Sequence, residues 1–218
     1  MYNNNIDGKS RIGGARPITN GTEFVLLTGG FNLALKDVPL ASEGKITAGT
    51  PIQVDEVTRL AKIFKQARVT KAVSAGTDVE VAKMTDAVWG SNPLKVGDIV
   101  MVMGAAGDTK GTGVTIDAID TSDADMDKIT VSAAITAAKD GYLVLAAAAG
   151  ATQSPAVLPN AIMPYDLVKD PSATQITIEA CFAITNGQVY NNRIPEIPLP
   201  VRVYLTSQNC FFRWSNSK

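Results

Sequence analysis

The sequence predicts an all-β fold, in which a small β-barrel is inserted into a discontinuous β base domain. Short apolar runs alternate with Gly, Pro, Asn and Asp at intervals of about 8–12 residues, the spacing of short strands joined by turns. A length of 218 residues and a hydrophobic content of 45% allow a sizeable core. Residues 72–150 hold five basic and eleven acidic side chains, whereas residues 1–71 hold ten basic and six acidic ones. The middle of the chain is therefore expected to form a unit of its own.

Three parts follow from this division. Residues 1–17 are polar and rich in Gly and Asn, which predicts a flexible N-terminal arm. Residues 72–151 are expected to form the inserted barrel, because the stretches rich in Ala, Gly, Ser and Pro at both ends are typical of linkers. Residues 18–71 and 152–218 then form the base. Neither piece of the base has enough strands for a core, so the two pieces must pair with each other across the insertion.

Each expected strand is a short run of apolar, β-branched or aromatic residues that ends at a turn residue. The middle strands are expected to curl into a barrel, because a few short strands close more readily than they stay flat. The expected strands are residues 23–28, 31–36, 51–54, 77–83, 98–104, 113–120, 128–135, 141–147, 175–185 and 201–206.

One further segment fits two structures. In the first, Asp55 caps a helix whose apolar residues recur at helical spacing. These residues are Val54, Val57, Leu60, Ala61, Phe64 and Ala67. In the second, residues 55–58 form the turn of a hairpin and residues 59–69 return as a strand. Periodicity alone favours the helix.

A proline-rich segment separates the last two expected strands. Pro195, Pro198 and Pro200 fall within six residues, and an interior strand does not tolerate them because each proline removes a ladder donor. The segment is therefore expected to be stiff and extended. Either it runs along a subunit surface, where stiffness lowers the entropic cost of docking, or it forms a rigid internal loop. In the first case its contact residues are Ile194, Pro195, Ile197 and Pro198.

Aromatic residues gather at two places that suggest contact with another subunit. Trp89 precedes the turn "NPLKVGD", and Phe211, Phe212 and Trp214 lie close to the C-terminus. Aromatic side chains are enriched at the centres of protein interfaces. The alternative is that these rings cap the barrel or the base core.

The residue types present argue against catalysis. The chain contains no histidine, which removes the commonest general base and a frequent metal ligand, and excludes a cysteine–histidine nucleophile within this chain. A pair of carboxylates remains open as hydrolytic machinery, but the acidic residues lie mainly in turn-like contexts without obvious pairing. We predict no enzyme activity, no catalytic residue and no cofactor.

Two short motifs were weighed as ligand sites. Asp123, Asp125 and Asp127 alternate as at the start of a calcium loop, but Lys128 and Ala134 stand where that loop needs Gly and Glu. We expect a solvated loop between two strands and no metal site. The glycines of "GAAGDTKGTG", residues 104–113, lack the order of a phosphate-binding loop, and a flexible hairpin loop is expected instead.

The cysteines, the N-terminal residues and the net charge indicate in which compartment and with which partners the protein is expected. Cys181 and Cys210 lie in apolar contexts that favour two buried thiols over a disulfide. The first residues lack a signal-peptide pattern, and no run reaches the length of about 20 apolar residues that a membrane span needs. With a net charge of −1, no nucleic-acid or membrane partner is predicted. Synthesis in a bacterial cytoplasm is expected.

Two stretches resemble a known family. "LASEGKITAGTPIQVDEVTRLAKIFKQARV", residues 40–69, resembles the part of bacteriophage head-decoration proteins where a Gly-Thr-Pro strand follows a turn. Residues 158–200, which include "DLV", a long apolar run, "GQV" and the proline-rich segment, look like a later part of the same proteins. The middle unit is similar to small barrels inserted into capsid-associated phage proteins, in which a "KVGD" turn recurs.

The resemblance to this family, lambda-type capsid decoration and head-fibre proteins, implies a function. Such a protein would bind the major capsid protein on the surface of a virion, commonly as a trimer, and would stabilise the shell. The N-terminal arm would become ordered on the capsid, and the acidic barrel would face outwards. The resemblance also implies a strand over residues 59–69. The alternatives are a phage tail or baseplate component, and a carbohydrate- or receptor-binding module that uses Trp89 or Tyr142 of the barrel.

Overall fold

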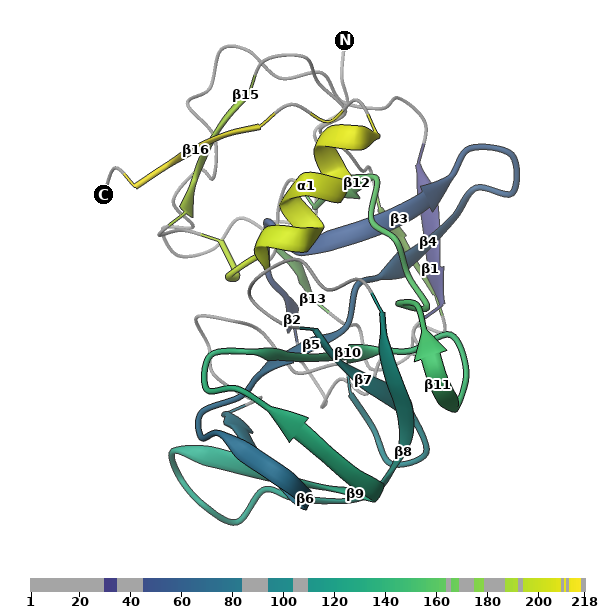
Figure 1. Ribbon diagram of the computed structural model, residues 1–218. Coiled ribbons are helices and arrows are strands. Elements are labelled where there is room, and N and C mark those ends of the chain that lie inside the picture. The colour runs from purple at the N-terminus through teal and green to yellow at the C-terminus, as the bar shows by residue number, and fades with distance from the viewer. Residues whose placement is uncertain are drawn as a thin grey trace, which may run out of the picture.

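The computed structural model contains two β-rich parts, a barrel and a base, which are stacked on each other (Figure 1). Apart from a single helix, the regular elements of the described residues are strands. The structure describes residues 30–34, 45–83, 94–103, 110–163, 166–168, 175–178, 187–191, 194–208, 210 and 212–216. The predicted arm, residues 1–17, and the predicted strand at residues 23–28 lie outside these ranges.

The base sheet combines strands from both ends of the chain. Its order is β12-β3-β4-β1-β14, in which β1 and β4 run parallel and the other neighbours antiparallel. A second small sheet pairs β2 with β13. The predicted pairing across the insertion is therefore confirmed. The strands are β1 (Phe31–Ala34), β2 (Lys45–Ile46), β3 (Pro51–Asp55), β4 (Leu60–Ile63), β12 (Ala161–Ile162), β13 (Leu167–Val168) and β14 (Gln175–Ile178).

The middle strands form an antiparallel sheet that curls and closes. Its order is β5-β10-β7-β8-β9-β6, and β11 pairs with β8 outside this path. The two edge strands meet where Val69 bridges Val81 and the Thr70 N–H donates to the Glu80 carbonyl at 3.0 Å. The strands are β5 (Gln66–Arg68), β6 (Val73–Ala82), β7 (Ile99–Met103), β8 (Gly111–Asp120), β9 (Met126–Ala137), β10 (Tyr142–Leu145) and β11 (Gly150–Gln153).

The ends of the barrel differ from the sequence prediction. Strand β5 hydrogen-bonds into the barrel sheet, although the predicted boundary at residue 72 left it in the base. The stretches read as linkers are strands β6 and β11. Gly113 of β8 is required at this point, because a Cβ there would lie 2.0 Å from the carbonyl oxygen of Ala148. Small residues therefore serve close backbone approach here rather than flexibility.

The barrel and the base share a hydrophobic core. Along β10, Leu143 points into the barrel with β6, β8 and β9, whereas Tyr142 and Val144 point toward the base. Strand β7 alternates in the same way, with Val100 inside the barrel and Met101 on the base side. Strands buried on both faces read as continuous apolar runs, which explains "DIVMVM" and "YLVL". The inserted unit is therefore packed onto the base, not tethered to it.

Residues 51–69 contain three strands, β3, β4 and β5, so the helix favoured by periodicity is wrong. The strand implied over residues 59–69 is divided, with β4 in the base sheet and β5 in the barrel. Strands β3 and β4 make a hairpin in which the Asp55 carboxylate accepts hydrogen bonds from the backbone N–H groups of Val57 and Thr58 at 2.8 and 3.2 Å. Arg59 takes a left-handed conformation with φ of 56° to complete the turn. Val57 and Leu60, which belong to the supposed helical face, are 92% and 45% exposed.

The end of the described chain forms a strand–helix–strand unit, and this corrects the expected strand at residues 201–206. Strand β15 (Gly187–Tyr190) runs parallel to β16 (Phe212–Ser215), and α1 (Leu199–Ser207) connects them. Parallel neighbours need a long crossover, usually a helix. Pro200 is tolerated in the first helical turn, where the missing N–H has no intrahelical partner anyway. Val201 and Leu205 are buried one turn apart, whereas Val203 is 63% exposed.

The other strand predictions are confirmed in position. The runs at 31–36, 51–54, 77–83, 98–104, 113–120, 128–135 and 141–147 overlap strands β1, β3, β6, β7, β8, β9 and β10. The run at 175–185 begins as β14, and residues 179–186 lie outside the described ranges. Six strands of two to four residues were not predicted; they are β2, β11, β12, β13, β15 and β16.

Candidate interaction surface

The proline-rich segment is an internal part of the base. Ile194 and Ile197 are 4% and 2% exposed, and Pro195 and Pro198 are buried. A Cβ on Gly49, which has φ of +84°, would lie 2.3 Å from the Cγ2 atom of Ile194. The prediction that these four residues form a surface contact is therefore wrong for their side chains, and the alternative of a rigid internal loop is correct. Pro198, which immediately precedes α1, has an extended backbone with φ of −54° and ψ of 142°.

Arg202 of α1 ties the helix to both neighbouring segments. Its Nε donates to the carbonyl of Ile197 at 2.9 Å, and its guanidinium carbon lies 4.6 Å from the centroid of the Trp214 ring. Phe212 and Trp214 are partly buried, with ring centroids 5.3 Å apart, and both pack against the shared core. These two rings therefore cap the core. Phe211 and Trp89 lie outside the described residues.

A polar contact joins the barrel to the proline-rich segment. The phenol of Tyr142 is hydrogen-bonded to Glu196, and burial together with this carboxylate raises the pKa of Tyr142 above its usual value. The Gln66 side-chain amide donates to the carbonyl of Glu196. Because Tyr142 is only 5% exposed, its ring offers no face to a sugar, which removes this residue from the carbohydrate-binding alternative.

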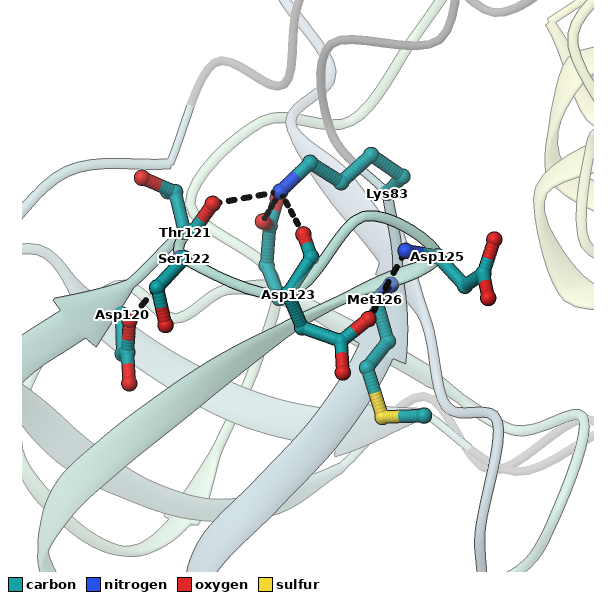
Figure 2. Close-up of polar contacts among 8 residues, drawn as sticks. Lys83, Asp120, Thr121, Ser122, Asp123, Asp125 and Met126 are labelled. Atoms are coloured by element: carbon teal, nitrogen blue, oxygen red, sulfur yellow. Dashed lines mark hydrogen bonds and ion pairs between the residues drawn. The ribbon is translucent and has the colours of Figure 1, made fainter.

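The acidic loop between β8 and β9 is closed by a lysine. The Lys83 ammonium donates to the carbonyls of Thr121 and Asp123 at 2.7 and 2.6 Å and to Oδ1 of Asp127 at 2.7 Å (Figure 2). Asp127 is fully buried, so its charge is neutralised inside the protein. The ammonium group of Lys83 therefore occupies the place where the oxygen atoms of the loop converge.

The remaining carboxylates of this loop shape its backbone. Asp123 accepts from the N–H groups of Asp125 and Met126 at 2.8 and 3.2 Å, and Asp120 accepts from the N–H of Ser122 at 2.9 Å (Figure 2). The hydrogen bonds from Ser122 lower the pKa of Asp120. Within the described ranges, no three His, Cys, Asp or Glu side chains are grouped to hold a metal ion. The expected solvated loop between two strands is confirmed, since residues 121–125 are exposed between β8 and β9. Lys83, which closes this loop, is the residue that sequence reasoning missed.

A second buried ion pair anchors the "KVGD" turn. Lys65 contacts Asp98 at 3.2 Å, with side chains 7% and 11% exposed, and the same carboxylate accepts from the Lys95 N–H at 3.0 Å. Gly97 in this turn has φ of +88°, a conformation that favours glycine. The ion pair therefore holds the turn before β7 against the segment that connects β4 of the base to β5 of the barrel.

Cys210 is a structural thiol. Its Sγ donates to the carbonyl of Asn160 at 2.9 Å, and burial raises its pKa to about 11. A thiol that is protonated and buried is a poor nucleophile. The predicted buried thiol is therefore confirmed for Cys210, which is free, whereas Cys181 lies outside the described residues.

Most of the large apolar side chains that are exposed among the described residues lie on the base. Four of the five large apolar side chains exposed within the described ranges belong to the base, and only Val96 belongs to the barrel. The four are Val57, Leu60, Leu199 and Val203. The described base exposes three carboxylates, Asp55, Glu56 and Glu196. The barrel exposes six: Asp78, Asp117, Asp120, Asp123, Asp125 and Asp140.

The architecture defines an all-β protein of curled, largely antiparallel sheets, with α1 as the one helix of the described chain. Comparison with protein-family models, with curated proteins and with solved structures finds no match to this chain. No helix among the described residues is long and apolar enough to cross a bilayer.

Proposed function

We propose that this chain is a non-enzymatic structural protein of a bacteriophage or prophage virion, which attaches to the capsid surface through its base and stabilises the shell. Its partner is the major capsid protein, and its barrel projects outwards, as in a head-fibre base. The observation that carries the proposal is the uneven surface of the described residues: four of the five exposed large apolar side chains lie on the base, and six of the nine exposed carboxylates lie on the barrel. Exposed apolar groups mark contact surfaces, and charged groups keep a projecting part soluble.

The course of the chain supports the same proposal. The two stretches that resemble head-decoration proteins pack together in one base, where β3 of the first pairs with β12 of the second. The shared core holds the barrel in a fixed position on this base. A rigid body repeated at many equivalent shell sites adds modest contacts that together make the shell harder to open.

Co-sedimentation with empty capsids of the encoding phage tests this function. We expect the protein to pellet at a fixed ratio to the shell subunits, and the decorated shells to withstand a higher temperature than bare ones. The double variant Leu199→Ser/Val203→Ser removes exposed apolar groups from the base and is expected to pellet less. Val96→Ser, which makes the same kind of change on the barrel, is the matched control.

Two results would contradict the proposal. Protein that stays in the supernatant at every ratio does not bind the shell. Rings or tubes that form without shells would favour the alternative of a tail or baseplate component.

A further inference from the structure

The proline-rich segment is anchored to the base on both sides of Glu196. On one side, Ile194 is 4% exposed and packs so closely on Gly49 that this glycine has no room for a Cβ. On the other side, the carbonyl of Ile197 accepts a hydrogen bond from Nε of Arg202 in α1 at 2.9 Å. The backbone of Glu196 is therefore held in place relative to the base.

Two prolines stiffen the segment between these anchors. Pro195 and Pro198 stand on either side of Glu196, and both are buried. The proline ring fixes one of the two soft backbone dihedral angles, and Pro198 is extended, with φ of −54° and ψ of 142°. Residues 194–198 therefore act as a stiff strut that carries Glu196.

Glu196 reaches from the base to the barrel through two directed contacts. Its carboxylate is hydrogen-bonded to the phenol of Tyr142 in β10. Its carbonyl accepts a hydrogen bond from the side-chain amide of Gln66 in β5. Strands β5 and β10 are neighbours in the barrel sheet, so one residue of the strut contacts two adjacent barrel strands.

The apolar contact between the barrel and the base does not select an angle by itself. Met101 and Met103 of the barrel share a core with Ile162 and Val189 of the base. Apolar burial has no preferred direction, and methionine side chains adapt to irregular surfaces. Hydrogen bonds weaken steeply when their geometry changes. A tilt of the barrel would also leave the hydroxyl of Tyr142, which is 5% exposed, without its partner.

The other polar contact between the two parts lies at their covalent link. Lys65, which follows β4 directly before β5 begins, pairs with Asp98 at 3.2 Å. A contact at the link holds one point and leaves rotation about it open. Tyr142 lies on the neighbouring strand β10, so its contact with Glu196 adds a second point that limits this rotation.

We propose that residues 194–198 set the angle of the barrel on the base, and that Glu196 is the positioning residue, acting through Tyr142 and Gln66. The proline-rich segment then has a role that its burial alone does not explain. Without the two contacts, the barrel stays attached through the shared core but samples a range of angles.

This inference deepens the proposed function, on which its biological role rests, because a barrel that projects from many equivalent shell sites would then point the same way at each. The angle is a property of one chain and is measured without shells. Absent capsid binding together with a fixed angle contradicts the proposed function alone. Capsid binding by a chain whose angle does not depend on Glu196 contradicts the strut alone.

Residual dipolar couplings of the weakly aligned, isotope-labelled chain test the proposal. The couplings of the barrel and of the base are fitted separately, and in the parent chain both parts should report one common alignment. Glu196→Ala removes the side-chain contact and Gln66→Ala removes the main-chain contact. In the double variant the common alignment should be lost, with a weaker alignment for the barrel than for the base. The couplings within each part should still fit that part, which shows that both remain folded.

Three further variants separate positioning from other effects. Tyr142→Phe with Gln66→Ala removes the same two contacts from the barrel side and should also lose the common alignment. Glu196→Gln keeps an acceptor for the phenol and should keep the alignment of the parent chain. Glu80→Ala removes a carboxylate that pairs with Lys71 within the barrel, so it should leave the alignment unchanged.

Three results overturn the proposal. The first is a parent chain whose two parts do not share an alignment. The second is a Gln66→Ala/Glu196→Ala variant that keeps the common alignment, because the apolar core alone would then set the angle. The third is a loss of alignment in Glu80→Ala as large as in that double variant.

Discussion

Replacement of Lys83 by Met is the most direct test of how the barrel holds its acidic loop. The methionine keeps the length and the apolar stem of the side chain but removes the ammonium. Three hydrogen bonds of 2.6–2.7 Å are lost, two to backbone carbonyls and one to the carboxylate of Asp127. Because Asp127 is 0% exposed, water does not readily replace the ammonium at that carboxylate.

The size of the effect follows from burial. Removal of one partner from a buried ion pair costs about 3–5 kcal/mol, since the other charge is left uncompensated. The Lys83 side chain retains 21% exposure, so its pair lies at the weaker end of this range. We expect Lys83→Met to lower the free energy of unfolding by about 3 kcal/mol. With a urea dependence of about 2 kcal/mol per molar, the unfolding midpoint falls by roughly 1.5 M.

Urea denaturation followed by circular dichroism measures this change. The matched control is Lys71→Met, which breaks an ion pair of similar length, 3.1 Å, whose lysine is 72% exposed. Exposed pairs contribute between zero and about 1 kcal/mol, so the control should leave the midpoint almost unchanged. In the double variant Lys83→Met/Asp127→Asn the buried charge is gone as well, and part of the loss should be recovered.

The reasoning is refuted if Lys83→Met and Lys71→Met have equal effects. It is also refuted if Asp127→Asn fails to recover any stability in the Lys83→Met background. In either case the short contacts around the Lys83 ammonium would make no contribution of their own to the free energy of unfolding.

Three other expectations follow from close packing and from shifted pKa values. Gly113→Ala should lower the free energy of unfolding in urea by about 2 kcal/mol or more, because the added methyl group would overlap a backbone carbonyl. At Gly97 an added methyl group meets no atom within 4 Å, so Gly97→Ala should cost only about 1 kcal/mol of backbone strain. The Cys210 thiol has a pKa of about 11 in the folded protein, against 9.0 ordinarily, so it should resist alkylation until the chain unfolds. Its contribution to stability should be present below pH 9 and lost by pH 11. Rapid alkylation of the folded protein at pH 8 would contradict this. The pKa of Tyr142 is raised above 10.0, so stability should fall as the pH rises beyond 10, and Tyr142→Phe should reduce this fall in denaturation series measured from pH 9 to 11.

Several features of the fold could be predicted because they depend on local pattern. Alternating apolar and polar residues place one face of a strand in a core, and turn residues mark the ends of strands. Strands β6 and β9 obey this pattern, whereas β7 and β10 are continuous apolar runs that turn residues delimit. The pairing of the two flanks was predicted from a count of strands, since neither flank has enough of them alone.

The candidate site was less accessible to sequence reasoning. For the proline-rich segment, the sequence left a subunit contact and a rigid internal loop both open. The structure makes Ile194 and Ile197 core residues, since Gly49 and the barrel pack against that segment. Val57 and Val203, which are exposed, were instead assigned to a helical pattern and to an expected strand. A sequence shows that a residue is apolar, but exposure depends on which elements cover it.

By itself, the sequence determined the all-β class, the order of most strands and the insertion of one unit into another, because these properties follow from the spacing of neighbouring residues. Only the tertiary structure decided that residues 201–206 are helical: the same apolar spacing suits a strand or a helix, and the parallel pairing of β15 with β16 requires a crossover. It also decided that Lys83 closes the acidic loop. That lysine lies 44 residues from Asp127, and only the antiparallel register of β6 and β9 brings the two together, so no local pattern records the contact.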